Sequence, residues 1–175
     1  YTCTTGSFYK GVGWDTEICE IMSEVAGVPA FATSPSVVTA LNEFGAKKLS
    51  VVTPYPEWNN VRLKPYLEAK GFEVLNLEGH PETGSLQTPI PDHDPEEIFK
   101  FAVENCRPDA DALVCSCTDW RALEVVERLE QHLGKPVVTA NQATIWLVAR
   151  QLGIDGPING FGSLLREHLA LVAAG

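Results

Sequence analysis

The sequence has 175 residues, of which 45% are hydrophobic and 9% aromatic, and this composition excludes an intrinsically disordered chain. The formal net charge of −10 at pH 7 argues against nucleic acid as a partner, although the local field of a site can still attract a small anion. No apolar stretch approaches the roughly 20 residues that a membrane-spanning helix needs. We therefore expect a globular protein with neither a nucleic-acid nor a membrane partner.

The five cysteines include no CxxC pair and no Cys/His cluster at zinc spacing. This pattern is typical of free thiols in a reducing compartment, so we expect a cytoplasmic protein without a metal site. Cys19, Cys106 and Cys115 read as packing or core residues. The chain begins with Tyr1, inside what reads as the end of a strand, so we also expect that an N-terminal segment and part of the site lie outside this sequence.

Hydrophobic periodicity and turn residues predict strands that alternate with helices along the chain. Between Thr16 and Ala26, for example, apolar residues recur at helical spacing, and Gly27 follows as a typical stop residue. Strands are predicted at residues 1–5 (the tail of a strand), 28–33, 49–53, 72–77, 112–117 and 137–140. Helices are predicted at residues 16–26, 34–44, 57–70, 95–105, 120–133, 143–152 and 164–174.

This alternation predicts the α/β class, with a parallel sheet flanked by helices on both faces. Right-handed crossovers place the carboxyl ends of all strands at one edge, where ligands of such sheets bind. Small polar and hydroxyl-bearing residues follow the predicted strands there, and they can hold a carboxylate. The long stretch at residues 78–94, rich in Pro, Gly, His and Asp, is predicted to be either a lid or a mobile insert.

Two cysteines occupy matching places in a repeated pattern. Cys3 and Cys117 each end an apolar run and are each followed at once by threonine. After each copy come a helical stretch, a Gly-x-Pro tripeptide and a run ending in small polar residues, at residues 27–34 and 134–141. A repeated strand–Cys–helix–strand unit indicates two similar halves that face each other. Two thiols across one cleft can act on both sides of a small substrate.

Each candidate side chain also has a purely structural interpretation. Cys3 could be a core cysteine, but its position at a strand end before a glycine-bearing loop favours catalysis, and a nearby helix N-terminus would favour its thiolate. The same reasoning applies to Cys117. Tyr55 could be a surface residue or a donor to a substrate carboxylate, and Asn141 could cap the next helix, contact the substrate or do both. The four histidines lack a ligand-spaced partner, so we expect none to be catalytic.

Five short runs, in this order, resemble the maleate cis–trans isomerase and arylmalonate decarboxylase family of the aspartate/glutamate racemase superfamily. They are YTCTTGSF at residues 1–8, GVP at 27–29, VTPY at 52–55, CT at 117–118 and ANQA at 140–143. The resemblance spans nearly the whole chain. It implies a cofactor-independent enzyme of two pseudo-symmetric, Rossmann-like α/β lobes with the active site between them. It also implies an N-terminal strand–loop region, ahead of the first cysteine, that supplies site residues.

Carried over residue by residue, the resemblance implies that Cys3 and Cys117 are the catalytic cysteines of the first and second lobes. It implies donors to a substrate carboxylate at four positions: Thr4, Thr5, Tyr55 and, through its backbone N–H, Thr118. The sheet-edge reasoning adds Asn141 to this substrate-binding set.

The same residues bear on the branch of the family. In the decarboxylase branch the first cysteine position is typically glycine, so Cys3 fits the two-thiol isomerase or racemase branch better. The run CTDWR at residues 117–121 departs from the maleate isomerase pattern. It looks closer to a branch associated with ectoine utilisation.

We therefore expect a cofactor-independent isomerase of a small carboxylate or dicarboxylate such as maleate, with one cysteine as thiolate and the other as thiol. The alternatives are an arylmalonate-type decarboxylase in which Cys117 alone supplies a proton, and an ectoine-utilisation relative or non-catalytic carboxylate-binding domain. We expect residues 1–50 to belong to a first lobe, residues 51–155 to form a second lobe, and residues 156–175 to pack back on the first. A homo-oligomer is a further possibility.

Overall fold

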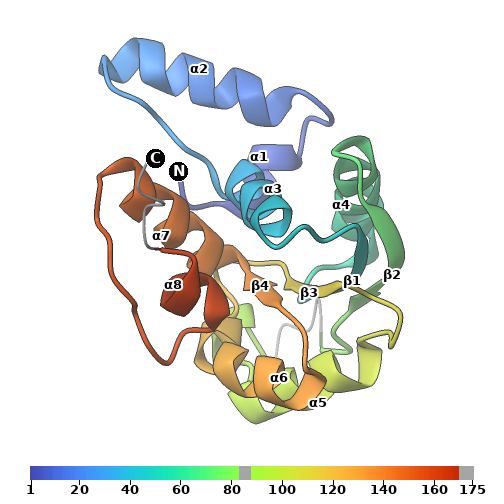
Figure 1. Cartoon of the computed structure of the whole chain (residues 1–175). Coiled ribbons are helices and arrows are strands. Elements are labelled where there is room, and N and C mark those ends of the chain that lie inside the picture. The colour runs from blue at the N-terminus through green and yellow to red at the C-terminus, as the bar shows by residue number, and fades with distance from the viewer. Residues whose placement is uncertain (83–87, 170–175) are drawn as a thin grey trace.

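Four parallel strands form the sheet at the centre of the molecule (Figure 1). The computed structural model describes residues 1–82 and 88–169, and within them the spatial order of the strands is β2-β1-β3-β4. Their bounds are Lys48–Thr53 for β1, Glu73–Gly79 for β2, Ala112–Cys115 for β3 and Val137–Thr139 for β4. Every neighbouring pair is parallel, so all carboxyl ends meet at one edge. The predicted α/β class is confirmed.

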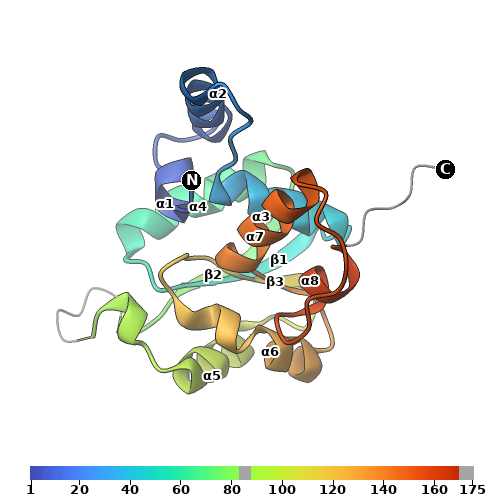
Figure 2. The ribbon, with the colours of Figure 1, turned by 90° about the vertical axis from the view of Figure 1, so that its left-hand side faces the viewer.

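Helices cover both faces of this sheet, as the alternation of elements predicted (Figure 2). One face carries α3 (Thr33–Glu43), α4 (Glu57–Ala69) and α7 (Ala140–Gln151), and the other carries α5 (Pro95–Asn105) and α6 (Val126–Leu133). The central strand β3 is buried throughout, and β1 is buried at every position except Lys48. A strand covered on both faces needs nearly continuous apolar residues, which is the pattern that these two sequences have.

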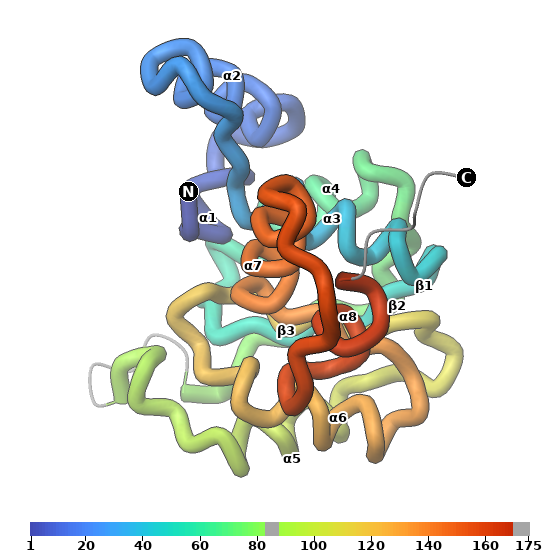
Figure 3. Tube along the Cα trace, turned by 60° about the vertical axis from the view of Figure 1, so that its left-hand side comes forward, coloured from blue at the N-terminus to red at the C-terminus, as the bar shows by residue number. Residues whose placement is uncertain are grey.

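The remaining elements lie around this core: α1 (Thr4–Phe8), α2 (Trp14–Ala26), η1 (Ile90–Asp92), η2 (Arg121–Glu124) and α8 (Ser163–Glu167). Helix α2 stands away from the sheet in Figures 1 and 3, and Asp15 is its only buried residue. The Asp15 carboxylate accepts a hydrogen bond from the Tyr66 hydroxyl at 3.0 Å and pairs with the Lys70 ammonium at 2.7 Å. In the part of the chain that the structure describes, no helix has the length and apolarity to cross a membrane.

Two predicted strands near the start of the chain are wrong. The strand tail predicted at residues 1–5 gives way to helix α1, and of the strand predicted at residues 28–33, residues 28–32 form an irregular segment and residue 33 begins α3. The two segments touch where the Tyr1 amino group donates a hydrogen bond to the Phe31 carbonyl oxygen at 2.7 Å. A strand needs a ladder of such bonds, and neither segment belongs to the sheet that the described residues form.

Other boundaries shift by a few residues. The strand predicted at 112–117 ends at Cys115, and the helix predicted at 120–133 is divided at Val125 between η2 and α6. Of the irregular stretch predicted at 78–94, the first residues extend β2, and residues 83–87 lie outside the described residues, as do residues 170–174 of the last predicted helix. The lid role stays a prediction. The pair of lobes and their boundaries stay predictions too, since the described residues form one sheet.

A buried hydroxyl network holds α1, and with it Cys3, against α3. Ser7 and Ser34 are both buried, and their hydroxyl oxygens are 2.7 Å apart. The Ser34 hydroxyl donates a hydrogen bond to the Thr4 carbonyl oxygen at 3.0 Å, and the Ser34 backbone N–H donates to the Ser7 hydroxyl at 3.0 Å. Because a buried polar group costs free energy when it loses its partner, the position of α1 depends on Ser34.

We expect Ser34→Ala to lower the free energy of unfolding by about 1–3 kcal/mol, because it leaves buried polar groups of α1 with one partner fewer. Thr39→Ala is the matched control, since Thr39 lies on the same helix but is exposed. The control should change the free energy of unfolding by less than about 0.5 kcal/mol. Urea denaturation of the two variants measures the difference, and equal unfolding midpoints would contradict the role given to Ser34.

Candidate active site

The candidate site lies at the sheet edge where loops leave the carboxyl ends of β1, β3 and β4. Tyr55 follows β1, Cys117 follows β3, and Asn141 lies in the first turn of α7, directly after β4. Cys3 approaches the same edge from the start of α1. The two cysteine-bearing segments are tied together, because the Thr118 hydroxyl donates a hydrogen bond to the Thr2 carbonyl oxygen at 3.2 Å.

Cys3 is the N-cap residue of α1. Its half-buried sulfur accepts a hydrogen bond from the Gly6 backbone N–H at 3.3 Å. The Tyr1 hydroxyl packs close to Gly6, since a Cβ atom there would lie 2.1 Å from its oxygen and 3.2 Å from the Cys3 sulfur, so a side chain at this position would displace the exposed Tyr1 ring. Partial burial and the neighbouring Cys3 sulfur raise the pKa of Tyr1, so its hydroxyl stays protonated beside the thiol. The Cys3 sulfur therefore has two hydrogen-bond donors beside it, the Gly6 N–H and the Tyr1 hydroxyl.

Cys117 occupies a different environment, with only 7% of its surface exposed. Burial raises the pKa of the Cys117 thiol, while the backbone N–H groups of Asp119 and Trp120 and the Tyr55 hydroxyl oppose that rise. The Asp119 N–H lies 3.4 Å from the sulfur. Cys117 therefore holds its proton at neutral pH, in surroundings that can support the thiolate once the proton has left.

Tyr55 lies between the two cysteine segments. Its side chain is 6% exposed, and its hydroxyl lies beside the hydroxyls of Thr4 and Thr5 and beside the Cys117 sulfur. Burial, followed by the charge of a Cys117 thiolate, raises the pKa of Tyr55 far above its ordinary value. The phenol is therefore a neutral hydrogen-bond donor. Its loop is fixed because the Tyr55 backbone N–H donates to the Thr53 hydroxyl at 3.1 Å.

Asn59 belongs to this cluster, although nothing in the sequence singled it out. It lies in the first turn of α4, is 2% exposed, and donates a hydrogen bond from its side-chain amide to the Thr5 hydroxyl oxygen at 2.8 Å. A first-turn asparagine reads as an ordinary capping residue in the sequence. Its partner is 54 residues away, so only the folded chain reveals the contact.

A cavity of about 560 Å³ opens beside the cysteine segments. Seven residues line it: Thr2, Cys3, Thr118, Asp119, Asn141, Thr144 and Ile145. The Asn141 side-chain amide donates a hydrogen bond to the Thr118 carbonyl oxygen at 3.0 Å, which connects the wall formed by α7 to the loop after β3.

The predicted site residues divide into two groups around this cavity. Cys3, Thr118 and Asn141 line it. Thr4, Thr5, Tyr55 and Cys117 do not line it, and form a largely buried layer around the Tyr55 hydroxyl. The arrangement offers a half-buried thiol, a buried thiol and several hydroxyl and N–H donors. It is suited to chemistry in which a carboxylate gains negative charge and a neighbouring carbon exchanges a proton.

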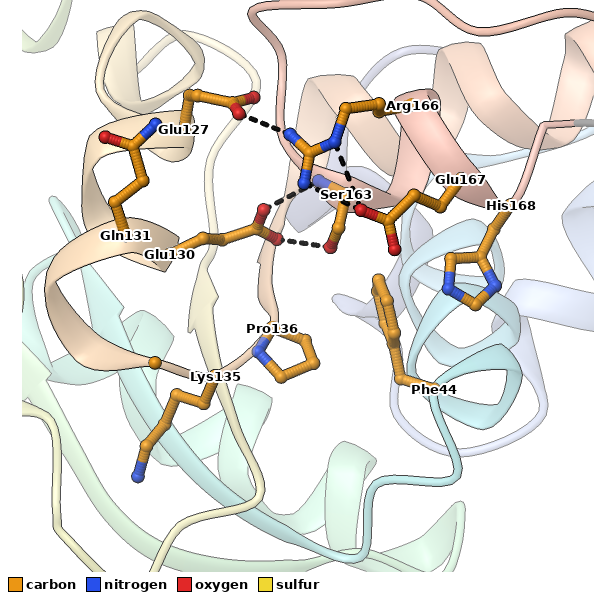
Figure 4. A pocket seen from close by; sticks show the side chains of 11 residues that line it. Phe44, Glu127, Glu130, Gln131, Lys135, Pro136, Ser163, Arg166, Glu167 and His168 are labelled. Carbon is orange, nitrogen blue, oxygen red and sulfur yellow. Dashed lines mark hydrogen bonds and ion pairs between the residues drawn. The ribbon is translucent and has the colours of Figure 1, made fainter.

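A second pocket, of about 420 Å³, lies among α6, α8 and the segments that precede β1 and β4 (Figure 4). Those segments lie at the amino edge of the sheet, opposite the cysteines. The carboxylates of this pocket already have partners, since Glu130 accepts hydrogen bonds from the Ser163 backbone N–H and hydroxyl and Glu127 pairs with Arg166. They fasten the α7–α8 connection to α6. Among residues 1–82 and 88–169, no group of three or more His, Cys, Asp or Glu side chains could hold a metal ion.

Comparison with known proteins gives consistent matches. A family model described as arylmalonate decarboxylase matches residues 2–165. The maleate isomerase of Alcaligenes faecalis is 28% identical over 144 residues, which cover 79% of this chain and 54% of that protein. The arylmalonate decarboxylase of Bordetella bronchiseptica is 26% identical over 170 residues, which cover 94% of this chain and 69% of that protein.

The fold also matches solved structures. A mutant of Nocardia farcinica maleate cis–trans isomerase with a covalently bound succinylcysteine intermediate superimposes with a TM-score of 0.86 at 24% identity, covering 95% of this chain and 70% of that one. This likeness concerns the fold. The chain spans about half the length of the Alcaligenes relative, 54% of it.

The unequal environments of the two cysteines predict unequal reactivity towards iodoacetamide at neutral pH. We expect Cys3 to be alkylated at least about tenfold faster than Cys117, because Cys117 is more completely buried and burial raises its pKa. Peptide mapping by mass spectrometry over a time course measures both rates in one sample. Cys115, fully buried with its pKa raised by burial to about 12, is the internal control that should remain unlabelled. Faster labelling of Cys117 than of Cys3 would contradict this description of the site.

Proposed function

Because the chain belongs to the arylmalonate decarboxylase family, we propose that it is a cofactor-independent cysteine isomerase of a small unsaturated dicarboxylate such as maleate. The observation that carries the proposal is the contrast between two thiols at one sheet edge. Cys3 is half-buried on the cavity wall with an N–H group on its sulfur, whereas Cys117 is almost covered. Such a pair suits a nucleophile and a proton donor. The maleate isomerases among the relatives support this substrate class.

In the first proposed step the Cys3 thiolate adds to one carbon of the substrate double bond. A C–S bond forms, and the π electron pair moves through the neighbouring carbon into its carboxylate as an enediolate. The Gly6 N–H donates a hydrogen bond to this sulfur at 3.3 Å and holds it on the cavity wall for the attack. The succinylcysteine in the Nocardia structure supports a covalent adduct of this kind.

The enediolate needs hydrogen-bond donors where its charge develops. The hydroxyls of Thr4, Thr5 and Tyr55 form one cluster, and we assign them to this carboxylate. We assign the Thr118 backbone N–H and the Asn141 amide to the other carboxylate, because both residues line the cavity. A dicarboxylate would then be held at both ends while its central bond changes.

The second proposed step uses the Cys117 proton. The thiol protonates the enediolate carbon, and the N–H groups of Asp119 and Trp120 stabilise the resulting thiolate. The former double bond is now single and rotates. The Cys117 thiolate then takes the proton back, the double bond re-forms in the other geometry, and the electron pair of the C–S bond returns to Cys3. Every atom and electron is recovered, so the cycle needs no external reactant.

Decarboxylation of a substituted malonate is the second candidate, because the matching family model carries that name. In this reaction the bond between the central carbon and one carboxylate breaks and carbon dioxide leaves. The electron pair of the broken bond moves into the remaining carboxylate, which becomes an enediolate. Cys117 would protonate that carbon without help from Cys3. The two candidates therefore differ in their need for Cys3.

We also propose where the protein is located, which class of partner it lacks, and that it forms an oligomer. All five cysteines, each within the described residues, are free thiols, which supports a reducing, cytoplasmic location. The net charge of −10 supports a partner other than nucleic acid. We also propose a homo-oligomer, supported by the exposed apolar side chains of Ile21, Val25 and Val28.

We expect Cys3→Ser and Cys117→Ser each to reduce the turnover of maleate by at least about a thousandfold, since each removes one chemical group of the cycle. Cys106→Ser is the matched control and should keep the wild-type rate. Proton NMR of the cis and trans isomers follows the reaction, and circular dichroism checks that each variant folds. Wild-type rates in both catalytic-cysteine variants would refute the isomerase proposal.

The same variants distinguish decarboxylation. With an arylmalonate as substrate, release of carbon dioxide that persists in Cys3→Ala and disappears in Cys117→Ser would favour the decarboxylase. Binding of dicarboxylates without turnover, and without exchange of carbon-bound hydrogen in deuterated water, would indicate a non-catalytic carboxylate-binding domain instead.

A further inference from the structure

Two histidines that the proposed reaction does not use are buried directly behind the Cys117 loop. His80 follows β2 and is 6% exposed, and His93 precedes α5 and is 1% exposed. Their ring centroids are 4.8 Å apart, and the ring of Phe101 closes one side at 5.0 Å from His80. A buried histidine pair is costly, because each ring must remain neutral or lose its hydration. The free-energy cost of burying both rings is explained if the pair has a function in the neighbouring site.

The pair is connected to both loops of the candidate site. The Trp120 indole N–H donates a hydrogen bond to His93 Nδ1 at 3.2 Å, and Trp120 is itself 1% exposed. Trp120 ends the loop that begins at Cys117, and its backbone N–H faces the Cys117 sulfur. On the other side, the His80 backbone N–H donates to the Thr53 carbonyl oxygen at 2.8 Å, next to the loop that carries Tyr55.

We propose that His93 is a positioning residue for Cys117: its neutral imidazole anchors the Trp120 indole and thereby fixes the turn whose backbone N–H groups meet the sulfur. The proposal rests on the proposed function only in that Cys117 is the proton donor. The ionisation of this thiol can be measured without any turnover, so the two proposals fail separately.

The hydrogen bond from Trp120 determines which tautomer of His93 can anchor the indole. Nδ1 accepts from Trp120 and therefore carries no proton, so the proton of the neutral ring is on Nε2. Adding a second proton would place N–H against N–H and abolish the bond. The anchor therefore exists only while His93 is neutral.

The surroundings set how protonation affects the pair. Burial, and then the neighbouring His93, lower the pKa of His80, while the carboxylates of Glu82 and Glu97 oppose this shift. Nearby, Arg121 faces the carboxylates of Asp92 and Asp94. Because the folded state disfavours the charged form of His80, the stability that neutral His80 contributes is present above pH of about 6.5 and is lost as the pH falls.

The test measures the alkylation rate of Cys117 at neutral pH in a Cys3→Ser background, with peptide mapping. We expect His93→Leu and Trp120→Phe each to slow this alkylation about tenfold at neutral pH, because the N–H groups no longer stabilise the thiolate. The two changes combined should slow it no further than either alone, since they remove the same contact. A merely structural role would loosen the loop, expose the sulfur and accelerate alkylation.

The conservative variant adds a second readout. In His93→Gln, whose amide oxygen can accept from the Trp120 indole, the alkylation rate at neutral pH should remain that of the chain with His93 intact. His132→Gln, on the exposed surface of α6, is the control and should leave the rate unchanged.

Three results would overturn the proposal: unchanged alkylation in His93→Leu and Trp120→Phe, acceleration in either of them, or a tenfold loss of rate in His93→Gln. Circular dichroism identifies any variant that unfolds. His93→Gln and Trp120→Phe keep the test decisive if His93→Leu does not fold. Failure of maleate turnover in the otherwise unchanged chain would refute the proposed isomerase and leave these alkylation results valid.

Discussion

The parallel pairing of β1 with β3 is the constraint on which the candidate site depends. Val52 lies opposite Cys115, and the Ser116 backbone N–H continues the ladder by donating to the Val52 carbonyl oxygen at 3.0 Å. The two strands therefore end side by side, and the loops that follow them leave at the same point. Tyr55 and Cys117 meet because of that register, and a one-residue slip would turn their side chains to opposite faces.

Cys3 depends on different interactions, since α1 does not belong to the sheet. Its position comes from the Ser7–Ser34 network and from the Trp14 indole N–H, which donates to the Gly6 carbonyl oxygen at 2.8 Å. One thiol is thus held by the most buried part of the fold and the other by a short helix attached through side chains. This difference agrees with the roles proposed for them, because a proton donor benefits from a dry fixed position and a nucleophile must reach its substrate.

The sequence predicted those features of the fold and of the site that depend on neighbouring residues, and missed those that depend on contacts between distant ones. Helix α5 was predicted with its exact bounds, Pro95–Asn105, because Asp94 caps it and its apolar residues recur at helical spacing. Residues 1–5 were predicted wrongly, because their apolar and β-branched residues indicate a strand only where a neighbour is available to pair. The link between Trp120 and His93 joins residues 27 apart, so no pattern in either segment announces it.

The hydroxyls beside Tyr55 suggest how the site is prepared for negative charge. Thr5 accepts a hydrogen bond from Asn59, so its own proton remains free to be donated. The buried Thr4 hydroxyl makes no hydrogen bond to any described residue. Folded chains rarely leave buried polar atoms unpaired, since each costs free energy, and a ligand is one of the few explanations. The hydroxyls of Thr4 and Thr5 both lie beside the Tyr55 hydroxyl. Donors that the fold already holds in place need little rearrangement when charge develops next to them, and this is how a site favours an enediolate over the carboxylate from which it forms.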